Sequence, residues 1–217
     1  MSSDAVDQLH AELETRGIAL PADQVRQLAD YAARLWEWNE KINLTRHTDF
    51  AKFASRDIVD TLELAKVLEA DESVLDVGTG GGVPGVVLAI VRPDLRVALS
   101  ESVGKKARVV EEIVRSLSLK IPVHAARAED LLENEYFDTL AIRAVAPLSK
   151  LLRWFTPRSG AFGRMLVIKG PAWVEERLAA RQENLMRDFQ LRKLSTWPLE
   201  GTHSESVLLE MRPKNDE

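Results

Sequence analysis

The chain has 217 residues, 45% of them hydrophobic and none of them cysteine, and its formal net charge is −5. This length can bury one substantial hydrophobic core and is too short for two full-sized domains. Without cysteine the chain can form no disulfide and no thiolate metal site. The missing thiolate also excludes the covalent attack by which enzymes methylate C5 of a pyrimidine.

The charge is unevenly distributed along the chain. Residues 1–72 carry 8 basic and 15 acidic side chains, and residues 73–217 carry 21 basic and 19 acidic ones. The acidic total argues mildly against a nucleic-acid partner, because phosphate binding draws on Lys and Arg. Residues 141–170, however, hold six cations and no acidic residue: Arg143, Lys150, Arg153, Arg158, Arg164 and Lys169. These form either a local basic face or scattered, solvated cations, and charge alone does not separate the two.

Residues 1–70 are expected to form an N-terminal helical segment packed on the core, because apolar residues recur there at helical spacing. Gly17 stands just past the predicted end of the first helix and Pro21 at the start of the second, which is where these residue types are favoured. No apolar run approaches the roughly 20 residues that a membrane span requires. We therefore expect a cytoplasmic protein with no membrane partner and, since no segment is typical of a dimerisation helix, a monomer.

After residue 71 short β-rich runs alternate with helical ones. Strands are predicted at 73–77, 96–100, 121–124 and 139–142, and helices at 84–91 and 105–118. Such alternation indicates βαβ units and a mostly parallel sheet with helices on both faces. A strand at 161–168, a long polar helix at 171–187 and closing strands at 191–198 and 206–211 follow. The closing strands predict an antiparallel hairpin at the sheet edge, which completes a domain over residues 71–217.

A glycine-rich turn follows the first of these strands. It fits the pattern acid-x-Gly-x-Gly-x-Gly, filled by Asp76, Gly78, Gly80 and Gly82. Glycines allow positive φ and let a ligand approach the main chain closely. The dinucleotide pattern G-x-G-x-x-G would need a third glycine where Val83 stands, and a pyrophosphate would need a bare helix N-terminus. The turn therefore favours S-adenosylmethionine, which has no phosphate and whose ammonium a carboxylate near Asp76 would attract.

Two further strand ends complete the predicted cofactor site. Glu101 ends the second strand, where an acidic side chain can accept both hydroxyls of a ribose. After the third strand, Ala128 and Glu129 are placed to flank an adenine ring. The alternatives are a turn acid for Asp76 and a solvated strand-end charge for Glu101. Arg143 ends the apolar fourth strand and needs an acidic or phosphate partner, since an unpaired charge there is costly.

These segments together resemble the ordered motifs of the bacterial RsmG (GidB) family. They are residues 76–85 (DVGTGGGVPG), 101–106 (ESVGKK), 127–129 (RAE), 143–146 (RAVA) and 169–170 (KG), preceded by 38–45 (WNEKINLT). The resemblance covers roughly residues 25 to 170. It implies a Rossmann-like class I methyltransferase fold and an enzyme that transfers the methyl group of S-adenosylmethionine to N7 of a guanine in 16S ribosomal RNA. The implied partner is that RNA or the small ribosomal subunit.

Carried over by position, the family's cofactor contacts fall on Gly78, Val83, Ala128, Glu129 and Arg143. Three positions depart from the family pattern. Glu101 replaces the usual Asp and is longer by one methylene, Asp57 stands where the family commonly has a His, and Val83 is smaller than the typical Phe or Leu.

Guanine N7 carries a lone pair and no proton, so its methylation needs orientation and desolvation more than a general base. We assign no general base. The predicted substrate-positioning residues are Lys105, Arg127, Arg143 and Lys169, which could bind phosphates or guanine O6. The alternative interpretations are a solvated helix start for Lys105, a surface-loop cation for Arg127 and a strand-end lysine for Lys169. The four histidines have no ligand-like spacing, so no metal is assigned.

Other readings stay open at this point. The chain could be a methyltransferase of a small molecule or protein, or a ribosome-associated protein that binds the cofactor without turnover. A nicotinamide-dependent oxidoreductase is the weakest hypothesis, because the third glycine of the dinucleotide pattern is missing from this chain. Of the five tryptophans, Trp36, Trp154, Trp173 and Trp197 are expected to be core or contact residues, and Trp38 to be the possible exception that stacks on an unpaired base.

Overall fold

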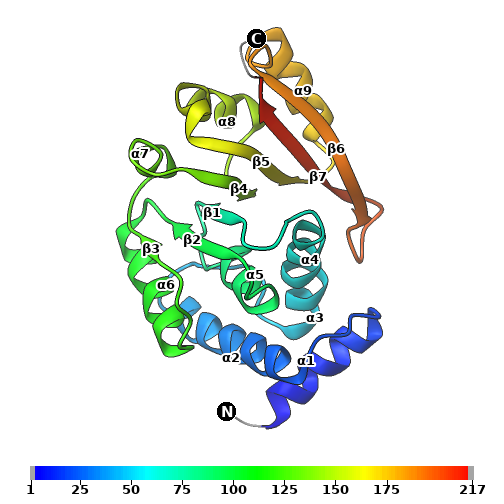
Figure 1. Cartoon of the computed structure of the whole chain (residues 1–217). Helices are drawn as coiled ribbons and strands as arrows, with labels where there is room; N and C mark the ends of the chain where they lie inside the picture. Colours follow the sequence, from blue (N-terminus) through cyan, green and yellow to red (C-terminus); the bar gives the residue numbers. More distant parts are fainter. Residues whose placement is uncertain (1–2, 215–217) are drawn as a thin grey trace.

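The computed structural model describes residues 3–214, and Figure 1 shows a central sheet between two layers of helices. The chain begins with α1 (Ser3–Thr15), α2 (Ala22–Asn39), α3 (Phe50–Lys52), a π-helical turn η1 (Phe53–Ile58) and α4 (Val59–Ala65). It continues with β1 (Ser73–Val77), α5 (Gly85–Val91), β2 (Arg96–Ser100), α6 (Gly104–Ser116), β3 (Val123–His124), α7 (Ala128–Leu131) and β4 (Phe137–Arg143). The last elements are α8 (Leu148–Phe155), the 3-10 turn η2 (Thr156–Ala161), β5 (Phe162–Lys169), α9 (Trp173–Gln182), β6 (Phe189–Pro198) and β7 (Glu205–Pro213).

The strands form one seven-stranded sheet in the order β3-β2-β1-β4-β5-β7-β6. The strands from β3 to β5 pair in parallel, whereas β7 pairs antiparallel with both β5 and β6. This confirms the mostly parallel, doubly wound sheet with an antiparallel hairpin at its edge. Because β1 lies between β2 and β4, the strand order reverses beside β1, and the loops after β1 and β4 leave the same edge as neighbours.

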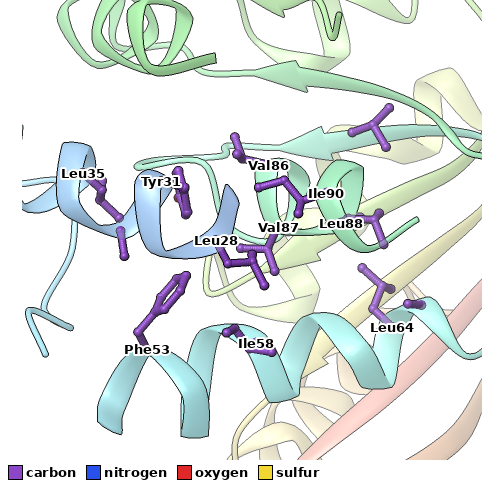
Figure 2. Close-up of a cluster of buried hydrophobic side chains, with 14 of the residues drawn as sticks. Leu28, Tyr31, Leu35, Phe53, Ile58, Leu64, Val86, Val87, Leu88 and Ile90 are labelled. Atoms are coloured by element: carbon purple, nitrogen blue, oxygen red, sulfur yellow. The ribbon is translucent and has the colours of Figure 1, made fainter. Parts of the chain in front are cut away.

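The sheet separates two hydrophobic clusters. Side chains alternate along each strand, so neighbours such as Val74 and Leu75 of β1 enter opposite clusters. One cluster packs against α8 and carries Leu151 and Phe155. The other packs against α2, η1, α4 and α5, as Figure 2 shows with Tyr31, Phe53, Ile58, Leu64 and Val87 among its members. The N-terminal helices thus bury their apolar faces against the helices that cover the sheet.

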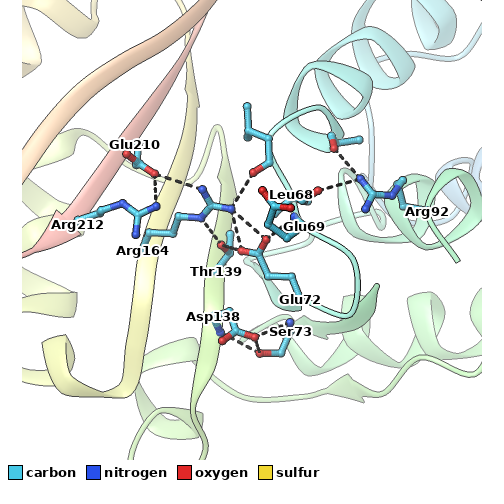
Figure 3. Close-up of polar contacts among 12 residues, drawn as sticks. Leu68, Glu69, Glu72, Ser73, Arg92, Asp138, Thr139, Arg164, Glu210 and Arg212 are labelled. Atoms are coloured by element: carbon cyan, nitrogen blue, oxygen red, sulfur yellow. Dashed lines mark hydrogen bonds and ion pairs between the residues drawn. The ribbon is translucent and has the colours of Figure 1, made fainter. Parts of the chain in front are cut away.

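The amino ends of the strands are closed by a polar network around Arg164 of β5 (Figure 3). Its guanidinium donates to Thr139 at 2.8 Å and to the carbonyl oxygen of Val67 at 2.8 Å. The same group pairs with Glu72 at 2.9 Å and with Glu210 at 3.2 Å. These contacts tie β4, β5, β7 and the segment before β1 together, so this edge of the sheet is cross-linked by its own side chains.

Several element boundaries differ from the expectation. The helices α7 and α8 were not predicted, and β3 covers only Val123–His124. The polar helix is shorter than residues 171–187, because it ends at Gln182 and Asn184 then adopts a φ of +57°. Gly17 has a φ of +65° after α1, and Pro21 directly precedes α2, as the positions of this glycine and proline predicted. No helix in residues 3–214 is long and apolar enough to cross a membrane.

Candidate active site

A cavity of about 190 Å³ opens at the carboxyl edge of the sheet, beside the reversal of strand order. Its lining comes from the ends of β1 and β2, the start of α7, the loop after β4 and helix α8: Val77, Gly78, Ser100, Ser102, Ala126, Arg127, Ala128, Glu129, Val145 and Trp154. A larger cavity of about 510 Å³ lies at the amino edge around Glu72 and Arg164. Those two side chains are paired with each other, so we place the chemistry in the smaller cavity.

The glycine turn has the backbone that the sequence pattern predicted. Gly78, Gly80 and Gly82 have φ values of +64°, +60° and +114°, which side chains rarely tolerate. A Cβ on Gly78 would lie 3.2 Å from the Val145 side chain, and one on Gly82 would lie 2.9 Å from the Tyr31 hydroxyl. Glycine at these positions therefore keeps the cavity open and lets the N-terminal helix α2 approach the turn.

Asp76 stabilises this turn through hydrogen bonds to its buried carboxylate. Its side chain is 1% exposed, and its Oδ2 accepts hydrogen bonds from the Thr79 hydroxyl and from the Gly85 N–H at 2.8 Å. Within residues 3–214 its other oxygen, Oδ1, is buried without a hydrogen-bond partner. Burial raises the pKa of Asp76 to about 6, against the lowering effect of the Thr79 and Gly85 hydrogen bonds. One oxygen thus serves the turn, and the other is left for a cationic partner.

Glu101 ties the turn to the start of α6. Its Oε2 accepts from the Gly80 N–H at 3.0 Å and its Oε1 from the Val103 N–H at 2.8 Å. The side chain is 6% exposed, so it is not the solvated strand-end charge of the alternative. Each carboxylate oxygen has a second lone pair, so both can still accept from a hydroxyl group.

Arg143, at the end of β4, pairs with two acidic residues. An acidic partner was expected at this position, because an unpaired buried charge is costly. Its Nη2 lies 2.5 Å from Asp57 Oδ1 and its Nε 3.3 Å from Asp60 Oδ2. Burial acts to lower the pKa of Arg143, but Asp57 and Asp60 outweigh it and raise the pKa. In the described part of the chain Nη1 is buried and has no partner. The guanidinium is thus held by internal partners, and the expected contact of Arg143 with substrate stays a prediction.

The two acids belong to a wider network that the sequence did not reveal. His47 Nδ1 lies 3.0 Å from both oxygens of Asp57, and Trp197 donates from Nε1 to Asp60 at 2.9 Å. Burial raises the pKa of Asp60, although Arg143 and Trp197 act to lower it. Asp57 thus pairs with both His47 and Arg143. The signal available was the spacing of Asp57 and Asp60, which puts both on one helical face.

Lys169 also has internal partners. Its ammonium donates to the Ala146 carbonyl oxygen at 2.5 Å and pairs with Glu176 of α9 at 2.7 Å. Glu176 accepts from the Leu148 N–H at 2.9 Å as well, which closes the start of α8. With its side chain only 10% exposed, Lys169 holds the β4–α8 loop, and its contact with substrate stays a prediction.

The remaining predicted cations are open to solvent. Lys105 lies in α6, and the first turn of that helix contains no acidic residue. Arg127 lines the cavity next to Ala128. The stretch 141–170, by contrast, forms no continuous free basic face. Five of its six cations pair with carboxylates: Arg143, Arg153, Arg158, Arg164 and Lys169.

The residues around the cavity fit S-adenosylmethionine. Ala128 and Val145 supply apolar walls for a base, and Glu101 offers acceptors for a ribose. The unpartnered Asp76 Oδ1 and Arg143 Nη1 carry opposite charge at the ends of adjacent strands, which matches an ammonium and a carboxylate of one amino acid. Fold and cavity together define a class I, Rossmann-like methyltransferase.

Comparison with known proteins agrees with this class. The chain resembles the O-methyltransferase from Bacillus cereus in complex with SAH, with a TM-score of 0.59, 15% identity and coverage of 96% of this chain and 99% of that one. It also resembles M. capricolum TrmK in complex with S-adenosyl-homocysteine, with a TM-score of 0.55, 13% identity and coverage of 71% and 67%. At these identities the likeness concerns the fold.

Sequence comparison is more specific. Residues 24–202 match the family model described as rRNA small subunit methyltransferase G. The chain is 46% identical to the Ribosomal RNA small subunit methyltransferase G of Rhodopirellula baltica over 94% of its length and 95% of that protein's. It is 36% identical to the protein of the same name from Pseudomonas aeruginosa, with 96% and 98% covered. The chain therefore belongs to the rRNA small subunit methyltransferase G (GidB) family, whose members are S-adenosylmethionine-dependent methyltransferases.

Proposed function

We propose that this protein methylates N7 of a guanine in 16S ribosomal RNA, using S-adenosylmethionine, and that it works in the cytoplasm as a monomer on the RNA or the small ribosomal subunit. The observation that carries the proposal is the cavity at the reversal of strand order, which is built from the family's own motifs. The names of the relatives supply the substrate class.

When bound, S-adenosylmethionine supplies a methyl group on a sulfonium, which is reactive enough for direct displacement by a lone pair. Guanine N7 has such a lone pair and loses no proton, so the residues around the cavity need only bind, orient and exclude water. This fits a site in which Asp76 and Glu101 hold the backbone of the glycine turn and Asp57 pairs with Arg143. No group is needed to accept a proton.

The chain's own residues divide into two sets in this proposal. The cofactor contacts are Gly78, Ala128 and Glu129 in the cavity, Glu101 for the ribose, and Asp76 and Arg143 through their unpartnered atoms. Gly80, Gly82 and Val83 shape the turn that carries these contacts. The second set is Arg127, exposed in the cavity lining, and Lys105, exposed at the start of α6, and both would bind RNA phosphates.

The reaction is tested with labelled S-adenosylmethionine and small-subunit RNA from a strain that lacks its own enzyme of this family. Digestion of the RNA to nucleosides should give label in 7-methylguanosine alone. Label in another methylated nucleoside would overturn the choice of N7. The net charge of −5 and the five paired cations favour a different acceptor as the second candidate. Cofactor binding without any label in RNA or subunits would move the proposal to that candidate.

The RNA contact is tested by Lys105→Glu, with Arg192→Glu as the matched control. Both side chains are exposed, but Arg192 lies on the edge strand β6, away from the cavity. Lys105→Glu should raise KM for RNA about tenfold, a loss that shrinks at high salt, while affinity for S-adenosylhomocysteine stays unchanged. Equal KM values for the two variants would show that Lys105 does not contact the RNA.

A further inference from the structure

The cavity has an aromatic wall that comes from a helix outside the recognised motifs. Trp154 of α8 is the one aromatic side chain among the described residues that line this cavity, and it is half-buried. Ala128 and Val145 line the same space. These apolar side chains, with Val77 and Ala126, line a cavity of about 190 Å³ whose remaining lining is Gly78, two serines, Arg127 and Glu129.

The position of the Trp154 ring is determined from two sides. Within α8, Leu151, Leu152 and Phe155 are fully buried in the hydrophobic cluster, which anchors the helix. Lys150, one turn earlier, places its ammonium 5.4 Å from the centroid of the Trp154 ring. A cation at this distance attracts the ring electrostatically and restricts its rotamer. The aromatic surface is therefore held in place before any ligand binds.

The other four tryptophans have different environments. Trp36 donates from Nε1 to the His47 carbonyl oxygen at 2.7 Å, and Trp197 is buried and bonded to Asp60. Trp38 lies beneath Lys41, and Trp173 beneath Arg177 at 5.2 Å. Trp154 alone among the five, all of which lie within residues 3–214, contributes to the cavity lining.

An aromatic side chain and small apolar side chains that line one cavity suit a heteroaromatic ring. Stacking on an aromatic side chain is the general way in which proteins hold a base without reading its sequence. Glu129, in the same lining, can accept a hydrogen bond from an exocyclic amino group. A purine carrying such an amino group is the ligand that uses all of these features.

We propose that Trp154 is a cofactor-binding residue that stacks on the adenine of S-adenosylmethionine. The inference rests on the proposed function, since it assumes an adenosyl ligand in this cavity. It adds an aromatic contact to the site, from a helix that neither the glycine turn nor the strand-end acids would identify.

The test compares Trp154→Ala with Trp173→Ala. Both rings are half-buried, belong to the same hydrophobic cluster and have a cation close to their face, but only Trp154 lines the cavity. Calorimetric titration with S-adenosylhomocysteine should show a loss of affinity of about 10- to 100-fold for Trp154→Ala and less than threefold for Trp173→Ala. Trp154→Phe should recover most of the affinity. Thermal melts of both variants control for unfolding.

Free adenosine is the second probe. Because the contact is to the base, Trp154→Ala should weaken adenosine and S-adenosylhomocysteine by the same factor. Unchanged affinity for both ligands in Trp154→Ala would overturn the inference, and so would a variant that loses only its affinity for RNA. Failure of the wild-type protein to bind S-adenosylhomocysteine would instead contradict the proposed function itself, so the two failures can be told apart.

Discussion

The carboxyl of Asp76 is buried in the turn that it holds, and this gives folding a defined pH dependence. Burial raises the pKa from the ordinary value of 3.8 to about 6 in the folded protein. The stabilising contribution of the protonated form is therefore fully present below about pH 4 and is lost as pH rises through about 6.

Asp76→Asn should remove this dependence, because the amide keeps an acceptor oxygen for Thr79 and Gly85 and does not titrate. Between pH 4 and 7 the unfolding free energy of the wild type should fall, relative to the variant, by on the order of 3 kcal/mol. Urea unfolding at several pH values measures the difference. Parallel profiles for the two proteins would show that Asp76 titrates alike in the folded and unfolded chain.

The conformation of some single residues could be predicted from the sequence, but the partners of others could not. Positive φ at Gly78, Gly80 and Gly82 is a local demand of the backbone, so the glycine pattern was sufficient to predict it. The need of Arg143 for an acid was also predictable, but the acid was not, because Asp57 lies 86 positions away in the chain. Exposed Lys105 and internal Lys169 look alike in sequence, and only the packing of α9 against the β4–α8 loop separates them.

The loop between β4 and α8 is held by α9 through the pair of Lys169 and Glu176. This loop carries Val145 into the cavity, and Ala144 within it adopts a φ of +55°. A non-glycine residue in that conformation costs on the order of 1 kcal/mol, so surrounding contacts must hold it. The contacts of Glu176 meet that need, because they fix the loop at Ala146 through Lys169 and at Leu148 directly.

Glu176→Ala should therefore weaken binding of S-adenosylhomocysteine several-fold and lower the unfolding free energy by about 2 kcal/mol, because it leaves Lys169 without its carboxylate and the Leu148 N–H without its acceptor. Glu176→Gln, which can still accept from Leu148, should lose less. Glu175→Ala, on the exposed side of the same helix, is the control and should match the wild type. Calorimetry and urea unfolding measure the two effects, and equal affinities for the Glu176→Ala and Glu175→Ala variants would contradict the positioning role.

The elements themselves were predicted best where periodicity and length agreed. The strands β1 and β2 and the helix α5 match their predicted ranges to within a residue, since each is an apolar run next to a strong turn signal. Helix α8 was not predicted, although Leu148, Leu151, Leu152 and Phe155 have helical spacing. It has only eight residues and follows Pro147, so its periodic pattern is short. As a result the aromatic wall of the cavity was missed.

The N-terminal helices take part in shaping the glycine turn. Tyr31 of α2 donates to the Gly81 carbonyl oxygen at 3.0 Å, and a Cβ on Gly81 would lie 2.9 Å from Leu35. Arg16 after α1 also pairs with Glu200 in the β6–β7 turn at 2.6 Å, so the segment is attached to the far end of the chain. Its division from the rest at residue 70 remains a prediction from sequence patterning.

Gly81→Ala tests this contact, with Gly104→Ala as the control because a Cβ there meets nothing within 4 Å. Gly81→Ala should lower the unfolding free energy by about 1–3 kcal/mol, since the Leu35 side chain and the Leu44 backbone must shift to admit the Cβ. It should also weaken binding of S-adenosylhomocysteine, whereas Gly104→Ala should change neither quantity by much. Unaltered binding in a destabilised Gly81→Ala protein would show that the N-terminal helices support the fold without shaping the cofactor site.

We propose that the cavity at the carboxyl edge serves methyl transfer to one guanine N7 of small-subunit RNA. This proposal is tested most directly by mapping the modification, since 7-methylguanine allows selective cleavage of the RNA chain at the methylated nucleotide. RNA from a strain lacking the family's enzyme, treated with this protein and S-adenosylmethionine, should be cleaved at a single position. Cleavage should be absent when Arg143→Ala replaces the wild type. An uncleaved RNA, or cleavage scattered over many guanines, would contradict the claim.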